Sequence, residues 1–382
     1  MDRRGFLRAG AFAGMASAGT ASRLSAAASP SGLGWLSSRP NLRADGTLRL
    51  NANENPLGIS PGAREAVIEA ITEANRYPDS RQEELVSRLA KRNNLRSENV
   101  YLGAGSTEIL QMAVQALASS GRPLIVAEPT FEDVLGYRRP FPYRLVTVPL
   151  DFRYAHDLGR MREEAERSSR PSVVYICNPN NPTGSITPSA EVDAWIQDAP
   201  ESVFFIIDEA YYELVDDASY WSALGWVDRR PNVLVTRTFS KIFGMAGLRI
   251  GYGLAHEDTV ARFKEFQSNK STTQLSAAAA LASLDDDEFV AQSLESNRAA
   301  GAVVKETLDE LGLGYLPSHT NFIMHEIQGD LQDYITRFLD QGIAVGRPFP
   351  PMLGYNRLSL GAEDEMGRWA ETIRSFRARG WT

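Results

Sequence analysis

Apolar residues along this chain gather into short, nearly continuous runs that are separated by stretches with helical spacing. The continuous runs cover residues 124–127, 173–177, 203–207 and 233–235. Short apolar runs of three to five residues between helical stretches are typical of strands buried on both faces of a mainly parallel sheet. We therefore expect an α/β fold in which these four runs are neighbouring core strands.

Helical spacing is clearest in the first third of the chain. Ser60 can cap a helix whose first turn contains Pro61, and Ala63, Val67 and Ala70 fall on one face of that helix. A second helix is expected over residues 83–93, and the glycine turn in GAGSTE leads into a third helix near residue 106. Beyond about residue 275 the strands become sparse, and a helix precedes a smaller mixed unit that starts near residue 315.

Composition and charge narrow the class of partner. The 382 residues carry a formal net charge of −8, and no basic stripe with interleaved aromatic residues is present. A nucleic-acid partner is therefore not expected, and a small-molecule substrate is the better expectation. The four histidines lack metal-ligand spacing, so no metal site is expected. Cys177 is the single cysteine, which excludes an internal disulfide.

The N-terminal residues form a segment of a different kind. Arg3 and Arg4 precede Phe6 and Leu7, a mild run rich in Ala and Gly follows, and three alanines at 26–28 suit signal-peptidase cleavage. This order resembles a twin-arginine export signal at residues 1–28, which implies the twin-arginine export machinery as a partner and a periplasmic or extracellular location. The run is too short and too weakly apolar for a stable membrane span.

Polar segments follow directly after three of the expected strands. They are NPNNPTG at residues 178–184, DEAY at 208–211 and TFSK at 238–241. Ligands of open α/β sheets bind outside the carboxyl ends of the strands, so these segments are expected to converge on one site. GAGSTE adds a helix N-terminus that suits a phosphate, and Arg249 adds a charged fork for the same anion.

These chemical groups together match one cofactor. The amine of Lys241 can form a Schiff base with an aldehyde, and the carboxylate of Asp208 can keep a ring nitrogen protonated. The helix N-terminus and Arg249 suit a phosphate group. An aromatic molecule with an aldehyde, a basic ring nitrogen and a phosphate is pyridoxal 5'-phosphate, and the order of these residues predicts that cofactor.

The chain resembles the fold-type I, class I/II aminotransferases that depend on pyridoxal phosphate, and most closely their histidinol-phosphate aminotransferase-like branch. The resemblance extends over nearly the whole chain after the N-terminal segment. It is carried by the ordered motifs NANENP, RYPD, GAGSTE, EPTF, NPNNPTG, DEAY, SK with AGLR, and TNF. It implies a mainly parallel, mixed seven-stranded sheet in a large domain, and a smaller α+β domain built from the C-terminal part and the N-terminal segment.

The resemblance also implies roles at the cofactor. Lys241 would be the Schiff-base lysine and proton carrier, Asp208 would pair with the pyridine nitrogen, and Asn181 and Tyr211 would hydrogen-bond the ring hydroxyl. Phe131 of EPTF would stack on the ring. Lys241, Asp208 and Tyr211 are the expected catalytic residues. The phosphate would be held by Gly105, Ser106, Thr107, Thr238, Ser240 and Arg249.

Further roles concern the substrate and the oligomer. Asn55, Arg347 and Arg357 are the expected substrate-binding residues, and Tyr77 of RYPD would reach the phosphate of the neighbouring subunit. The resemblance therefore implies a homodimer with shared active sites. Leu57 follows NENP where relatives often carry an aromatic residue. We expect the donor to be an amino acid or a related amine, with histidinol phosphate left open.

The resulting hypothesis is an enzyme that moves an amino group from such a donor to a 2-oxo acid by a ping-pong mechanism. A decarboxylase of the same fold, like the threonine-phosphate decarboxylases, is the alternative. The expected domains are an N-terminal arm at residues 29–60, a large cofactor-binding domain at 61–275 and a small C-terminal domain at 276–382.

Overall fold

The computed structural model describes residues 45–118, 121–137, 143–167, 171–268 and 271–381. The expected export signal at residues 1–28 and the first part of the N-terminal arm lie outside these residues. Among the described residues, no helix combines the length and the apolar character that crossing a membrane requires.

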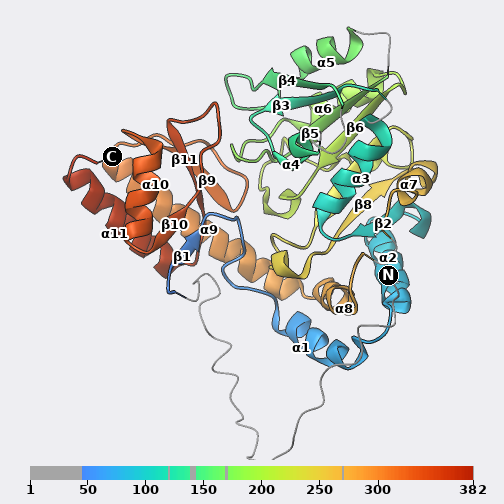
Figure 1. The fold of residues 1–382 in the computed structure, drawn as a ribbon, viewed down its shortest axis with the longest axis horizontal. Helices are drawn as coiled ribbons and strands as arrows, with labels where there is room; N and C mark the ends of the chain where they lie inside the picture. The colour runs from blue at the N-terminus through green and yellow to red at the C-terminus, as the bar shows by residue number, and fades with distance from the viewer. Residues whose placement is uncertain (1–44, 119–120, 138–142, 168–170, 269–270, 382) are drawn as a thin grey trace, which may run out of the picture. The chain divides into compact units, whose positions relative to one another are not determined.

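A seven-stranded mixed sheet forms the centre of the described chain (Figure 1). Six of its strands run in the same direction, and β8, which pairs antiparallel with both β2 and β7, runs opposite to them. The α/β fold with a seven-stranded sheet is the one expected from the sequence. In sheet order, the strands are β2 (Val100–Gly103), β8 (Gly251–Ala255), β7 (Val233–Thr238), β6 (Val203–Asp208), β5 (Ser172–Cys177), β3 (Leu124–Glu128) and β4 (Leu145–Pro149).

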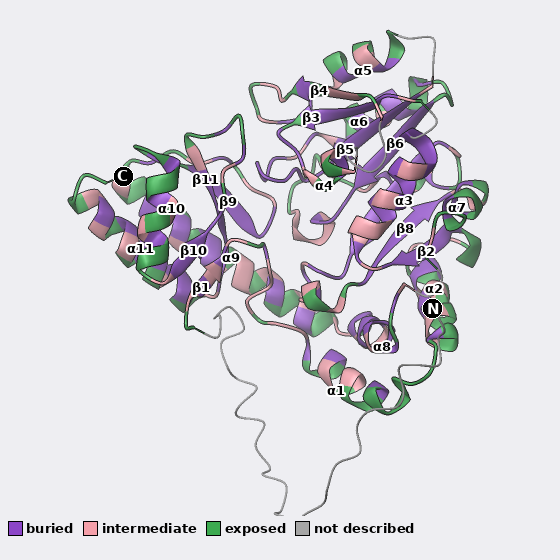
Figure 2. Cartoon of the chain, viewed as in Figure 1, coloured by how far each residue is buried: buried purple, intermediate pink, exposed green. Residues whose placement is uncertain are grey.

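Helices bury both faces of this sheet. Successive residues of one strand point to opposite faces, and in β5 Val174 and Ile176 belong to one apolar core while Val173 and Tyr175 belong to another. Figure 2 shows the central strands buried along their length. Residues from α3 and α7 contribute to the second core, and residues from α1, α2, α5, α6 and α8 contribute to the first. The continuous apolar runs therefore reflect strands that are covered on both sides.

The first and third expected helices begin where the sequence indicates, whereas the second, expected over residues 83–93, begins earlier, at Asp79. Ser60 caps α1, and its Oγ accepts a hydrogen bond from the N–H of Ala63 at 3.1 Å. The third expected helix begins at Ser106, directly after the glycine turn. The helices packed on the sheet are α1 (Pro61–Ala70), α2 (Asp79–Arg92), α3 (Ser106–Ala118), α4 (Asp133–Gly136), α5 (Leu158–Glu166), α6 (Ser189–Asp198), α7 (Glu257–Lys264) and α8 (Gln274–Ser283).

Short 3-10 helices occupy several of the connections. They are η2 (Ile71–Glu73), η3 (Ser97–Asn99), η4 (Tyr212–Leu214), η5 (Ala223–Trp226) and η6 (Ala246–Leu248).

The C-terminal part has an apolar core of its own. The long helix α9 leads from the neighbourhood of α8 toward it (Figure 1), and it ends at Gly312 in the left-handed conformation (φ 63°). Strand β1 pairs with β10, with Leu48 opposite Ile343, so the N-terminal segment joins this part. Its elements are β1 (Leu48–Leu50), α9 (Asp287–Leu311), β9 (Phe322–Glu326), α10 (Leu331–Asp340), β10 (Ile343–Val345), β11 (Tyr355–Ser359) and α11 (Glu363–Ala378). The domain boundaries expected at residues 60 and 275 stay a prediction.

Candidate active site

A cavity of about 330 Å³ lies at the carboxyl ends of β5, β6 and β7. The three polar segments that follow these strands all contribute to it, as Asn181, Asp208 and Lys241 illustrate. It is lined by Ala52, Asn53, Glu54, Ser106, Thr107, Thr130, Phe131, Glu132, Cys177, Asn181, Asp208, Ala210, Tyr211, Thr238, Ser240, Lys241, Ala246, Arg249, Arg347, Phe349 and Arg357.

Asp208 is a buried carboxylate at the last position of β6. Its two oxygens accept hydrogen bonds from the Tyr175 hydroxyl at 2.9 Å and the Thr236 hydroxyl at 3.0 Å. Burial raises the pKa of Asp208 to about 6, although these hydrogen bonds favour the charged form and oppose the shift. At neutral pH the cavity therefore holds a carboxylate that a buried cation would stabilise strongly.

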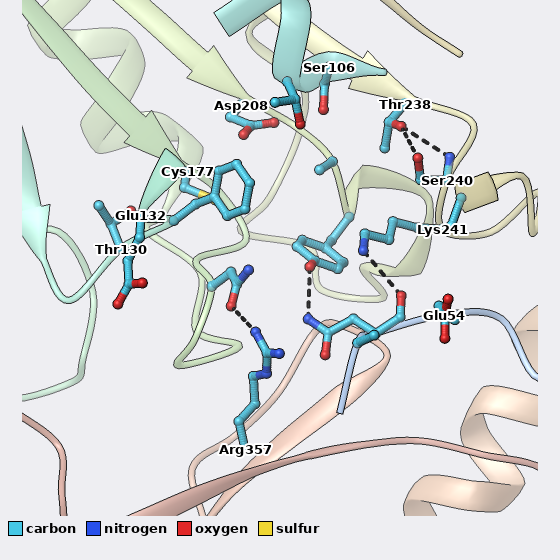
Figure 3. Close-up of a pocket in the computed structure, with 18 of the residues that line it drawn as sticks. Glu54, Ser106, Thr130, Glu132, Cys177, Asp208, Thr238, Ser240, Lys241 and Arg357 are labelled. Atoms are coloured by element: carbon cyan, nitrogen blue, oxygen red, sulfur yellow. Dashed lines mark hydrogen bonds between the residues drawn. The ribbon is translucent and has the colours of Figure 1, made fainter. Parts of the chain in front are cut away.

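Lys241 points into the cavity from the turn after β7, and Figure 3 shows its amine at the centre of the site. Its Nζ donates a hydrogen bond to the carbonyl oxygen of Asn53 at 3.1 Å. Burial, together with the positive charge of Arg357, lowers the pKa of Lys241 to about 8. A larger share of the neutral amine is therefore present near neutral pH than on an exposed lysine, which is what a nucleophile requires.

Asn53 connects several parts of the site, and sequence reasoning did not identify it as a site residue. Its Nδ2 donates to the Tyr211 hydroxyl at 3.1 Å, its Oδ1 accepts from the Ser359 hydroxyl at 2.8 Å, and its carbonyl oxygen accepts from Lys241. The backbone of Asn53 is left-handed, with φ 54°, a conformation that asparagine tolerates better than most residues. The NANENP motif therefore orients two of the expected catalytic side chains.

An anion cradle forms where the start of α3 meets the turn after β7. Ser106 and Thr107 belong to the first turn of α3, where helix N–H groups have no partner within the helix. The Thr238 hydroxyl donates to the Ser240 hydroxyl at 2.8 Å and accepts from the Ser240 N–H at 3.0 Å. Arg249 joins these groups at the cavity wall. Four hydroxyl side chains, a helix N-terminus and a guanidinium together suit a phosphate group.

Gly105 and Gly251 make room for this cradle. A Cβ on Gly105, whose φ is +77°, would lie 2.4 Å from Nη2 of Arg249. A Cβ on Gly251 in β8 would lie 2.4 Å from the backbone nitrogen of Ser106. Side chains at either position would therefore displace Arg249 or the start of α3.

Arg357 closes the cavity on the side of β11. Its Nη1 donates to Oδ1 of Asn181 at 2.7 Å and its Nη2 donates to the carbonyl of Asn51 at 2.9 Å, while its buried Nε has no hydrogen-bond partner. The side chain is 7% exposed, and burial lowers the pKa of Arg357 to about 10, so the group stays charged at neutral pH. Figure 3 shows Arg357 on the opposite side of the site from Ser106. A buried cation with neutral partners suits an anionic group of the substrate.

Arg347 lies at the same cavity but is held differently. Its guanidinium forms two hydrogen bonds with the carboxylate of Glu132, at 3.2 and 2.5 Å. Both side chains are about half exposed, at 54% and 43%. Arg347 therefore lines the cavity as part of an ion pair.

Three of the expected site residues do not line this cavity. Asn55 donates its side-chain amide to the carbonyl of Ile242 at 2.9 Å and to the Ser293 hydroxyl at 3.0 Å, and it lines a small neighbouring cavity instead. Tyr77 is 75% exposed. Their expected roles toward the substrate and toward a neighbouring subunit stay predictions. Gly105 does not line the cavity but contacts Arg249 as described above.

Other lining residues were not expected from the sequence. Glu54 pairs with Arg49, and the Thr130 hydroxyl donates to Oδ1 of Asn180 at 2.9 Å. Cys177 is buried and also lines the cavity. Cys177 is the last residue of β5, as Asp208 is the last residue of β6. Its position at the end of a strand could therefore have identified it as a lining residue.

A buried ion pair stabilises the strands that carry the site. Glu209 follows Asp208, and Arg237 precedes Thr238. Nη2 of Arg237 lies 2.9 Å from Oε2 of Glu209, and both side chains are almost fully buried. This pair links β7 to the segment directly after β6, behind the cavity.

Comparisons with known proteins agree with this geometry. A family model described as aminotransferase class I and II matches residues 45–373. Histidinol-phosphate aminotransferase 1 of Dechloromonas aromatica is 37% identical over 331 residues, which cover 85% of this chain and 89% of that protein.

Two solved structures are also similar. A putative histidinol-phosphate aminotransferase from Erwinia carotovora atroseptica is 36% identical with a TM-score of 0.87, covering 88% of this chain and 98% of that one. The histidinol-phosphate aminotransferase of Sinorhizobium meliloti, solved in complex with pyridoxal-5'-phosphate, is 29% identical with a TM-score of 0.80, covering 86% and 91%.

This chain belongs to the class I and II aminotransferase family. It is a transaminase with pyridoxal phosphate as its cofactor, which confirms the cofactor expected from the sequence. The comparisons support transamination rather than the decarboxylase alternative.

The residues of the cavity fit this cofactor. The anion cradle beside Gly105 has room for a phosphate only because that position lacks a Cβ. Asp208 is buried and raised in pKa, as expected for a carboxylate whose natural partner is a ring cation. Lys241 lines the same cavity as Asp208 and the anion cradle.

Proposed function

We propose that this transaminase takes the amino group from an amino acid or a related amine, such as histidinol phosphate, and passes it to a 2-oxo acid. The observation that carries this proposal is Arg357, a buried and charged guanidinium in the same cavity as Lys241. An anionic group on the donor would pair with Arg357 and bring the donor amine toward Lys241. The names of the relatives at 34–37% identity support histidinol phosphate as one donor to test.

The cofactor would be held at both ends. Asp208 would hold its ring nitrogen, Asn181 and Tyr211 its ring hydroxyl, and Phe131 one face of the ring. Its phosphate would be held by Ser106, Thr107, Thr238, Ser240 and Arg249. When bound, pyridoxal phosphate supplies an electron-accepting ring that stabilises the negative charge left when a proton leaves the α-carbon of the substrate.

The side chains of the chain supply the proton transfers. Nζ of Lys241, once free, takes the proton from the α-carbon of the donor, and its lowered pKa keeps part of the amine neutral for this task. The carbonyl of Asn53 orients this amine. The donor product leaves before the 2-oxo acid binds, so the two half-reactions should give ping-pong kinetics.

The active enzyme is proposed to be a homodimer with shared active sites. Tyr77 is a large, mostly exposed side chain on the segment before α2, and it would reach the phosphate held by the partner subunit. Ile68 and Ile71, also exposed, lie on the preceding segment and would be covered by the same contact.

Export through the twin-arginine pathway to the periplasm or the exterior is also proposed. It rests on Arg3 and Arg4 and on the alanines at 26–28. Replacing Arg3 and Arg4 by lysine should keep the protein in the cytoplasm of the native host, and fractionation of the two forms would measure this. Equal export of both forms would contradict the signal.

The donor is identified by visible absorbance. Purified holoenzyme is mixed with single amino acids and with histidinol phosphate, and a true donor should remove the absorbance band of the bound aldehyde form within one turnover. A 2-oxo acid should then restore the band. If no amine changes the spectrum, the proposed donors are wrong.

A further inference from the structure

Once the cofactor contacts are set aside, the charges left in the cavity are few. Asp208, Lys241 and Arg249 are assigned to the cofactor, and Glu54 is paired with Arg49. Among the described residues that line the cavity, the charged groups that remain for the substrate are Glu132, Arg347 and Arg357.

Glu132 and Arg347 neutralise each other with a specific geometry. The two outer nitrogens of Arg347 face the two carboxylate oxygens of Glu132, Nη1 to Oε1 at 3.2 Å and Nη2 to Oε2 at 2.5 Å. This two-fold arrangement is the strongest form of an arginine–carboxylate pair. Nη1 of Arg347 also donates to the carbonyl of Pro348 at 3.0 Å. The guanidinium is therefore already engaged before a substrate enters.

Arg357 is held by neutral groups and not by a carboxylate. It is buried, its partners are the neutral oxygens of Asn181 and Asn51, and its Nε has no partner. The guanidinium carbons of Arg347 and Arg357 lie 4.1 and 4.6 Å from the centre of the same ring, Phe349. One substrate molecule bound at Arg357 would therefore place its other end close to the Glu132–Arg347 pair.

We propose that Glu132 is a specificity-determining residue that selects amino donors with a single negative group. By pairing with Arg347, Glu132 leaves Arg357 as the cation for the substrate among the described lining residues, and its own carboxylate repels a second anion. Donors with a second carboxylate, or with a phosphate monoester in addition to a carboxylate, are disfavoured. This inference rests on the proposed function and names the substrate class of the same site.

The position of Glu132 supports this role. It follows Phe131 in the EPTFE segment, so the loop that presents an aromatic ring to the cofactor also presents the carboxylate to the substrate. The next residue, Asp133, begins α4 and does not line the cavity. Because Glu132 and Arg347 are half exposed, solvent screens them, and we expect an effect on the order of tenfold rather than a thousandfold.

The test compares donors that differ in charge but not in size. Glutamate and glutamine form one such pair, and O-phosphoserine supplies a donor with both a carboxylate and a phosphate monoester. For Glu132→Gln, the ratio of kcat/KM for glutamate to that for glutamine should rise about tenfold over the wild-type ratio, mainly through KM. High salt should reduce this gain. O-phosphoserine should gain in the same direction.

Two further variants test whether the change in the glutamate-to-glutamine ratio comes from Glu132 and Arg347. Glu128→Gln removes an exposed carboxylate from the start of the same segment, outside the cavity lining, and should leave the ratio unchanged. Adding Arg347→Met to Glu132→Gln should remove a large part of this gain, because the released guanidinium is then absent while the repelling carboxylate stays removed. A Glu132→Gln ratio within twofold of wild type would overturn the proposal, as would a wild-type enzyme that prefers glutamate to glutamine.

Binding without turnover separates this inference from the proposed function. Calorimetry on the holoenzyme measures the dissociation constants of glutarate and its monoamide, which cannot donate an amino group. Glu132→Gln should bind glutarate about tenfold more tightly and the monoamide with unchanged affinity. If no amine reacts with the wild type, the proposed donors fail, whereas the glutarate measurement still decides the role of Glu132.

Discussion

At the scale of single residues, burial moves the pKa values of two groups in the cavity toward each other. The pKa of Asp208 rises to about 6 and that of Lys241 falls to about 8, and in both cases loss of solvent is the main cause. Paired shifts of this kind mark sites where protons are exchanged near neutral pH.

The amine of Lys241 should become reactive at lower pH than a surface lysine. In cofactor-free protein, labelling of Lys241 by an acylating reagent should increase with pH around a midpoint near 8, because only the neutral amine reacts. Mass spectrometry of the labelled peptide gives this midpoint. Arg357→Gln removes a cation that lowers the pKa of Lys241, so its midpoint should move upward. A wild-type midpoint near 10.4, the ordinary lysine value, would contradict the assignment.

Asp208 should govern cofactor affinity at low pH. Asp208→Asn removes the buried anion and should lower kcat by about 100-fold or more. In the wild type, cofactor affinity should fall as the pH drops through about 6, because the carboxylate becomes protonated. Tyr175→Phe removes a hydrogen bond that favours the charged form, so the same fall should begin at higher pH. Fluorescence titrations with pyridoxal phosphate measure both effects, and identical profiles for wild type and Tyr175→Phe would rule out this role of Tyr175.

Sequence motifs identified the chemical residues but not the residues that orient them. Lys241, Asp208 and Arg357 stand out because ionisable groups follow apolar runs or occur in recognisable motifs. Asn53 acts through its backbone conformation and through hydrogen bonds with Tyr211 and Ser359. Both of these partners are distant from Asn53 in the sequence. Side-chain type alone carries no signal for such a role.

At the scale of secondary-structure elements, the anion cradle depends on the close approach of β8 to the start of α3. Gly251 lies opposite Gly103 of β2 and Thr238 of β7, so β8 is fixed from both sides. The strand has no freedom to move away from α3 if a side chain is added.

Gly251→Ala should therefore weaken cofactor binding. Its Cβ would lie 2.4 Å from the backbone nitrogen of Ser106, and relief of that overlap would shift the first turn of α3. We expect a loss of about 1–3 kcal/mol in the free energy of unfolding and an affinity for pyridoxal phosphate about tenfold lower or worse. Urea unfolding and cofactor titration measure these quantities.

Gly247→Ala is the matched control, since no atom lies within 4 Å of its added Cβ. Equal effects of the two substitutions would show that the approach of β8 to α3 does not matter.

Core strands were the elements most predictable from the sequence. Strands β3, β5 and β6 and the first half of β7 coincide with the continuous apolar runs, because burial on both faces favours apolar residues along a strand. Strand β4 is less buried and β1 has three residues, so neither produces a run of this kind. The antiparallel direction of β8 is decided by its neighbours β2 and β7, which local pattern does not reveal.

At the scale of the whole molecule, the proposed dimer makes a specific prediction about mixed subunits. Lys241→Ala and Tyr77→Ala homodimers should each be weakly active, because every site lacks one residue. In a hybrid dimer, one site has Lys241 from one subunit and Tyr77 of the partner subunit, and it is complete. Activity should therefore rise when the two variants are mixed and allowed to exchange subunits.

A mixture with the summed activity of its components would contradict shared sites, provided that light scattering shows that subunits have exchanged. Mixing each variant with itself under the same conditions is the control for the exchange treatment.

The sequence by itself determined the fold class, the cofactor and most of the residues assigned to it, because apolar periodicity and the chemistry of short motifs are local properties. Only the tertiary structure decided which charges remain available to the substrate. Glu132 and Arg347 are 215 residues apart in the sequence, and their pairing depends on how the segment after β3 meets the segment after β10. Charge neutralisation acts over a few ångströms in space, so no spacing along the chain could have revealed it.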